Sequence, residues 1–160
     1  MEINIRLAKK EDLPQLIDLC LQAFKPIFDS FEKILGPEIY PIIYPDWRRA
    51  QTQVVMDEID NEDIIVWVGE VGDEVAGLVT QKLDQKSRIG EVHFLAVNPI
   101  FQNRGFGTAL NRHVLDQLRD AGMTVAMVST GGDISHAPAR HTYEKVGFIP
   151  LPIVNYYKKL

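Results

Sequence analysis

One stretch, IGEVHFLAVNPIFQNRGFGTALNRHVLDQL at residues 89–118, limits the fold of this chain most strongly. It begins as a strand-like apolar run, meets Pro99, passes two glycines and continues as an amphipathic helix expected over residues 106–121. Proline removes a donor from a strand ladder, and Gly122 stands where a helix commonly ends. The stretch therefore predicts a strand, a tight turn and a helix in direct succession.

The rest of the chain alternates strands and helices in one expected domain, residues 1–160. Two apolar β-branched runs flank a Gly-Asp turn near residues 71–73, which is typical of a hairpin. In residues 25–44 the apolar residues follow neither the helical nor the strand spacing, apart from a short helix near 30–35. The other expected elements are a first strand over 3–8, helices over 11–24, after Asp46 and over 135–146, and strands over 124–129 and 154–160. Interleaved elements of this kind predict an α+β fold around one mixed sheet.

Composition and charge exclude several classes of function. The formal net charge is -5 and the basic residues are scattered, so no surface for nucleic acid or an anionic membrane is expected. A charged N-terminus and the lack of an apolar run of about 20 residues predict a cytoplasmic protein. Cys20 is the single cysteine and lies at helical spacing with apolar neighbours, so we expect a buried structural thiol and no metal site.

The turn after Pro99 has the chemistry of an anion site. Backbone N–H groups at the start of a helix lack intrahelical acceptors, and the helix dipole adds partial positive charge. A phosphate group can bind there without a lysine, and Gly105 and Gly107 would let a pyrophosphate approach the backbone closely. The same glycines would also suit a plain strand-to-helix turn. Leu110 stands where a Rossmann fingerprint has its last glycine, so that nucleotide motif is not matched.

Two separated motifs resemble the GCN5-related N-acetyltransferase (GNAT) family. The first matches the pattern Q/R-x-x-G-x-G/A at Gln102, Gly105 and Gly107. The second, HAPARHTYEKVGF, has four family positions in register: Ala139, Tyr143, Gly147 and Phe148. The resemblance implies a mostly antiparallel mixed sheet of about six or seven strands with about four helices, whose fourth and fifth strands splay apart. It also implies acetyl-CoA as the cofactor.

The same resemblance implies a path for the cofactor. Backbone groups of Leu95, Ala96 and Val97 would contact the pantetheine arm. The pyrophosphate would be held by the turn residues Gln102, Asn103, Arg104, Gly105, Phe106, Gly107 and Thr108. The second motif adds Ala139 and Arg140. His136 stands where many family members have an asparagine, so this contact departs from the family pattern.

Acetyl transfer to a primary amine requires a base, because an alkylammonium with a pKa near ~10 is not a nucleophile. Strand alternation predicts that Glu91 and His93 share one sheet face while Val92, Phe94 and Ala96 share the other. The segment EVHFLAV resembles the strand that carries a catalytic glutamate in the histone-acetylating branch of the family. Glu91 is therefore the first candidate base and His93, acting through water, the second. An ordered water alone, or purely structural roles for both, are the alternatives.

Tyr143 is expected to be the general acid. A departing thiolate leaves more easily when a hydroxyl donates to it. Ala139 lies one helical turn before Tyr143, so a small residue leaves room beside the phenol. The alternative is that the tyrosine ring only packs.

The favoured function is an acetyl-CoA-dependent N-acetyltransferase using direct attack of the amine, and the alternative is a non-catalytic acyl-CoA-binding sensor. The acceptor, a small-molecule amine or a peptide, is not specified by the sequence. An aromatic set lies where the family often walls its acceptor site, and it equally suits a core or a homodimer contact: Phe28, Phe31, Tyr40, Tyr44 and Trp47. The expected buried residues are Phe94, Ala96, Leu110, Val114, Leu118, Val125, Met127 and Phe148.

Overall fold

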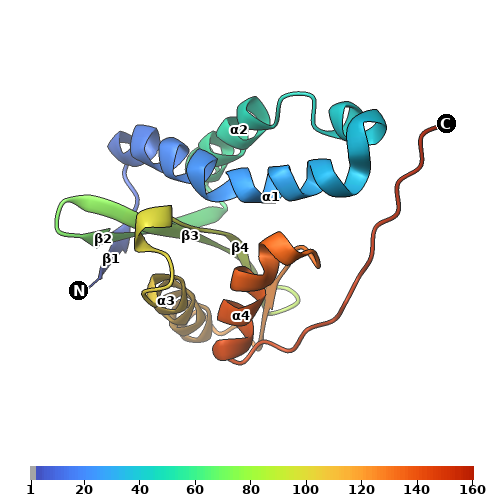
Figure 1. The fold of residues 1–160 in the computed structure, drawn as a ribbon. Helices are drawn as coiled ribbons and strands as arrows, with labels where there is room; N and C mark the ends of the chain where they lie inside the picture. The colour runs from blue at the N-terminus through green and yellow to red at the C-terminus, as the bar shows by residue number, and fades with distance from the viewer. Residues whose placement is uncertain (1–2) are drawn as a thin grey trace.

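A computed structural model describes residues 3–160 as one five-stranded sheet with two helices on each face (Figure 1). The strands, in sheet order, are β1 (Asn4–Leu7), β2 (Ile64–Val71), β3 (Glu74–Asp84), β4 (Ile89–Val97) and β5 (Val125–Val128). The helices are α1 (Leu13–Ile43), α2 (Trp47–Asp60), α3 (Phe106–Asp120) and α4 (Ala137–Lys145). Short 3₁₀ turns span Lys10–Asp12, Pro99–Phe101 and Ile134–His136. The predicted α+β fold is confirmed, with five strands in place of six or seven.

The fourth and fifth strands diverge, as expected. β1 to β4 pair antiparallel, whereas β5 runs parallel to β4 and pairs with it only from Ile89↔Val125 to Val92↔Val128. The second half of β4 still pairs with β3, through Leu95↔Val79 and its neighbours. One edge of that half therefore has no strand beside it, and this edge borders an opening in the sheet.

A β-bulge lies in β4 where the opening begins. Val92 is opposite Gln81 and Phe94 is opposite Thr80, so His93 is an extra residue with no partner. Val92 consequently packs on the α3 side, while Phe94 and Ala96 pack on the α1 side. The prediction that these three side chains share a face was wrong, because the extra residue shifts the alternation.

Each face of the sheet has its own apolar core. On the α1 and α2 side, Leu16, Cys20 and Val55 pack over β2 and β3, and on the α3 side Leu110 and Val114 pack over β3 and β4. The predicted burial of Cys20 is confirmed, and burial raises the pKa of its thiol to about 12. Of the expected core, Ala96, Leu110, Val114 and Leu118 are buried, whereas Phe94 and Phe148 are half-buried.

The expected burial of Val125 and Met127 was wrong. The two residues are 55% and 45% exposed. β5 is the edge strand of the described sheet, and its other two residues, Ala126 and Val128, face the α3 core. Alternation therefore places Val125 and Met127 on the opposite face, at the rim.

The segment that lacked a clear period folds mainly as helix. α1 extends far beyond the expected residues 11–24 and includes the short helix near 30–35. Gly36, at φ 72 and ψ 176, interrupts it with a kink. Phe28 stacks on Trp47 of α2 with ring centroids 4.5 Å apart, so aromatic packing holds the two helices together. Asp46 caps α2 as predicted, accepting from Arg49 N at 3.0 Å.

The expected terminal strand over residues 154–160 was wrong. After α4 the chain is extended and runs away from the sheet toward the far end of α1 (Figure 1). Lys159 Nζ lies 3.7 Å from Glu38 Oε2 there. A strand requires a neighbour for its backbone groups, and this segment lies beside none, which accounts for the smaller strand count. No helix in residues 3–160 is long and apolar enough to cross a membrane.

Candidate active site

The predicted cofactor turn lies at the mouth of the opening between β4 and β5. Gln102 Nε2 donates to the carbonyl of Val97 at 3.0 Å, which ties the turn to the end of β4. Asn98 accepts from Ile100 N at 3.1 Å and caps the 3₁₀ turn that follows the strand. Local hydrogen bonds therefore hold the path from strand to helix.

Two left-handed residues shape the turn before α3. Asn103 has φ 59 and Gly105 has φ 86, conformations that asparagine and glycine adopt more readily than other residues. Phe106 anchors the helix start because its ring packs edge-on against that of Phe101, with ring centroids 5.6 Å apart. The N–H groups of Phe106, Gly107 and Thr108, in the first turn of α3, lack intrahelical acceptors. Free amides at a helix start can bind an anion, and a pyrophosphate contact here stays a prediction.

The backbone of this turn is open to close approach at Gly105. A Cβ on Gly105 would meet nothing within 4 Å, so the backbone there is open to approach. A Cβ on Gly107 would lie 3.5 Å from Thr142 Cγ2 and 3.6 Å from Val97 Cγ2. The first turn of α3 thus faces a site bounded by the end of β4 and by α4.

Two other predicted cofactor residues brace the loop between β5 and α4. His136 Nδ1 lies 2.5 Å from Asp133 Oδ1, and the His136 ring stacks on Phe31 with centroids 5.7 Å apart. Arg140 donates from one nitrogen to the carbonyls of Gly131 and Asp133, both at 2.7 Å. These contacts position the start of α4, and a cofactor contact for either residue stays a prediction.

Asp133 joins this loop to α1. Its carboxylate accepts from Ser30 at 2.7 Å and also from Ser135. Burial opposes ionisation of this carboxyl, but the hydrogen bonds from Ser135, Ser30 and His136 outweigh it and hold its pKa well below its usual range. The loop is therefore fixed by a charged centre.

Tyr143 lies on the α3 side of the opening. The residue is 8% exposed, and its ring packs edge-on against Phe148, with ring centroids 5.9 Å apart. Burial raises the pKa of the Tyr143 hydroxyl to about 12, so it keeps its proton at neutral pH. Ala139 is half-buried one turn earlier on the same helix, and the room it would leave beside the phenol stays a prediction.

His93 and a buried carboxylate meet on the opposite side of the opening. His93 Nδ1 lies 2.6 Å from Glu58 Oε1 of α2, with the histidine side chain 38% exposed and the glutamate side chain 5%. The second oxygen, Glu58 Oε2, accepts from Thr80 Oγ1 of β3 at 2.6 Å. Helix and sheet thus contribute one carboxylate, one hydroxyl and one imidazole to a connected group.

Glu91 also faces this side. Gly90 and Val92 pack against the α3 side, so the residue between them points toward α1 and α2. Its side chain is half-buried, and within residues 3–160 it has no hydrogen bond or ion pair. His93 therefore has a fixed protein partner and Glu91 has none.

Sequence reasoning missed Glu58 and Thr80. Glu58 is on the buried face of α2 with Gln51 and Val55, and a carboxylate in such a stripe was the available signal. Thr80 lies in an apolar strand, and no sequence signal there indicated a functional role.

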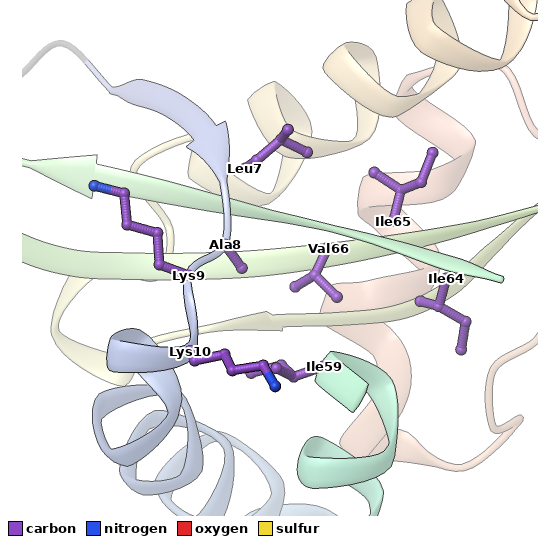
Figure 2. Close-up of a pocket in the computed structure, with 8 residues that line it drawn as sticks. All are labelled: Leu7, Ala8, Lys9, Lys10, Ile59, Ile64, Ile65 and Val66. Atoms are coloured by element: carbon purple, nitrogen blue, oxygen red, sulfur yellow. The ribbon is translucent and has the colours of Figure 1, made fainter. Parts of the chain in front are cut away.

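A separate hollow of about 390 Å³ contains none of the predicted site residues. It lies where β1, β2 and the end of α2 meet, and Figure 2 shows Leu7, Lys9 and Ile59 among its lining side chains. In the part of the chain that the structure describes, no three acidic, histidine or cysteine side chains gather closely enough to hold a metal ion.

Comparisons with solved structures agree with the fold. PaiA N-acetyltransferase from Thermoplasma acidophilum, in complex with coenzyme A, matches with TM-score 0.69 at 18% identity, covering 93% of this chain and 91% of that one. Aminoglycoside 6'-N-acetyltransferase AAC(6')-IG from Acinetobacter haemolyticus matches with TM-score 0.68 at 13% identity, covering 98% of each chain.

Sequence comparison adds a relative and a family. Mycothiol acetyltransferase of Rhodococcus opacus (strain B4) is 39% identical over 70 residues, 44% of this chain and 22% of that protein. The chain thus spans about a fifth of that relative's length. Residues 28–148 match the acetyltransferase (GNAT) family. The strand opening, the glycine turn at its mouth and this match together show that the chain belongs to the GNAT family of acetyltransferases, which use acetyl-CoA.

Proposed function

We propose that this protein transfers the acetyl group of acetyl-CoA to a primary amine by direct attack. The observation that carries the proposal is the opening between β4 and β5 with the amide-lined start of α3 at its mouth. Acetyl-CoA supplies the acetyl thioester. Amides of the Gln102–Thr108 turn hold its pyrophosphate, and the free edge of Leu95–Val97 hydrogen-bonds its pantetheine arm.

Acid and base lie on opposite sides of the opening. A base on β4, Glu91 or His93, removes a proton from the acceptor ammonium. The new bond joins the amine nitrogen to the acetyl carbon while the carbon–sulfur bond breaks. Tyr143, neutral because burial raises its pKa to about 12, gives its proton to the departing sulfur. The nitrogen loses a second proton as the amide forms, and this proton restores Tyr143, while the proton on the base passes to solvent, so charge and atoms balance.

The acceptor is proposed only by class. A small-molecule amine or a peptide amine has to reach the α1 and α2 side, where Phe24 and Phe94 stack 5.1 Å apart beside His93. The AAC(6')-IG structure is that of an aminoglycoside acetyltransferase, so polyamine-like sugars belong in a first panel of acceptors.

Thiol release from acetyl-CoA, measured over a panel of aminoglycosides, polyamines and peptides, tests the proposal. We expect acetyl-CoA binding by calorimetry and turnover with at least one amine. Binding without turnover on the whole panel would favour the sensor instead. Failure to bind coenzyme A would contradict both functions.

A further inference from the structure

Glu58 is the only acidic side chain among residues 3–160 that is buried, with 4% of the residue exposed. A buried carboxylate is costly unless it is paired and hydrogen-bonded. Both of its oxygens have partners, Thr80 on one and His93 on the other. Pairing a buried carboxylate adds little net stability, so the direction in which Glu58 points is more informative about its role than the pairing itself.

It points at the bulge where the sheet opens. Bulges re-aim side chains and are common beside active sites. Phe94, the next residue, is fixed by stacking on Phe24 of α1, so the bulge is clamped on one side by an aromatic pair and on the other by Glu58. His93 nevertheless stays accessible, with 38% of its side chain exposed.

The contact sets the orientation of the imidazole. With Nδ1 2.6 Å from a carboxylate oxygen, the Nδ1 proton faces Glu58 and the Nε2 lone pair faces away. Nε2 has no protein partner in the described chain. A base held by a third group in this way has the geometry that proton transfer requires.

We propose that Glu58 is a positioning residue that holds His93 as the general base of acetyl transfer, with Thr80 fixing the second carboxylate oxygen. This rests on the proposed function and selects His93 over Glu91. Glu58 touches neither substrate nor cofactor in this proposal. It acts by selecting the histidine tautomer and by stabilising the imidazolium that forms when the proton is taken.

The kinetic test compares Glu58→Gln with Asp57→Asn. Both remove one negative charge from α2, but Asp57 is exposed and its carboxylate accepts only from Gln53, at 2.8 Å. We expect Glu58→Gln to lower kcat about 10- to 100-fold with KM for acetyl-CoA within about 2-fold of wild type. For Asp57→Asn, both kcat and KM should stay within about 2-fold of wild type. Equal kcat values for Glu58→Gln and wild type would overturn the proposal.

The spectroscopic test does not need turnover. Long-range ¹H–¹⁵N spectra of histidine-labelled protein should show His93 with its proton on Nδ1, and Glu58→Gln should shift it toward mixed tautomers. Thr80→Val, which keeps the carboxylate but frees one oxygen, should give a smaller shift and about a 3-fold lower kcat. It serves as the test if Glu58→Gln does not fold. A tautomer that neither variant changes contradicts the pairing.

The two proposals fail differently. If wild type accepts no amine, the proposed function fails even where the spectra confirm the Glu58–His93 pair. If wild type turns over and the Glu58 and Thr80 variants do too, with unchanged spectra, only the positioning role fails.

Discussion

The two sides of the opening between β4 and β5 are built from different parts of the chain. On the α3 side the part of the candidate site that would hold the cofactor consists of backbone: amides of one turn, two glycines and a strand edge, with Tyr143 as the one candidate reactive side chain. On the α2 side it consists of three side chains, Glu58, Thr80 and His93, from three separate elements. The first is suited to holding a large anion and the second to moving one proton.

Because the two sides are built differently, they should respond differently to substitution. A site of backbone amides is changed only by residues that alter the path or fill the space. A site of side chains loses its chemistry when one polar atom is removed. Variants of the backbone turn and variants of the reactive side chains should therefore separate cofactor affinity from turnover.

The largest expected effect is that of His93→Ala. Removal of the base should lower kcat by about 10²- to 10⁴-fold and leave the Kd for coenzyme A unchanged, as checked by thiol release and calorimetry. Glu91→Gln is the informative companion. A greater loss in Glu91→Gln than in His93→Ala would assign the base to Glu91.

Tyr143→Phe should have the next largest effect. It removes the hydroxyl that we propose donates to the sulfur and keeps the ring that packs on Phe148. We expect about a 10²-fold lower kcat with little change in melting temperature. Since the hydroxyl pKa is raised to about 12, wild-type kcat should show no loss from its ionisation as pH rises from 7 to about 10. Full activity of the variant would show that Tyr143 only packs and does not act as the acid.

Gly107→Val tests the backbone side. Its Cβ would make ordinary contacts with Thr142 and Val97, so the fold should tolerate it, while the added methyls crowd the pyrophosphate site. We expect the Kd for coenzyme A to rise about 10-fold or more and kcat at saturation to change little. Gly105→Ala is the control for strain, because φ 86 should cost about 1 kcal/mol of stability in any other residue. Unchanged affinity in Gly107→Val would place the pyrophosphate elsewhere.

The smallest expected effect is a loss of stability in Asp133→Asn. The folded pKa of Asp133 lies below the ordinary value of 3.8, so its contribution is fully present above that pH and is lost as pH falls through the folded pKa. We expect the variant to lose about 1 kcal/mol near neutral pH, measured by denaturant unfolding, and the difference from wild type to shrink below about pH 4. A constant difference down to pH 2 would mean that charge is not the cause.

The α+β fold, the hairpin, the cap at Asp46 and the glycine turn were all predictable from the sequence, because each depends on neighbours along the chain. Glycine at a left-handed position and apolar spacing at a helical period act within a few residues. Prediction from local sequence failed where the outcome depends on whether a distant strand lies alongside. Val125 and Met127 lost their expected burial because β5 is an edge strand, and residues 154–160 lacked a strand to pair with.

The sequence by itself determined the backbone half of the site, since Pro99, Gly105 and Gly107 act on the local path of the chain. It also supplied two candidates for the base without separating them. Only the tertiary structure decided which one has a partner. Glu58 is 35 residues from His93 and 22 from Thr80, as their numbers show, and the packing of α2 on the sheet brings the three side chains together. Contacts of that separation depend on how helix and sheet pack, and no local pattern encodes them.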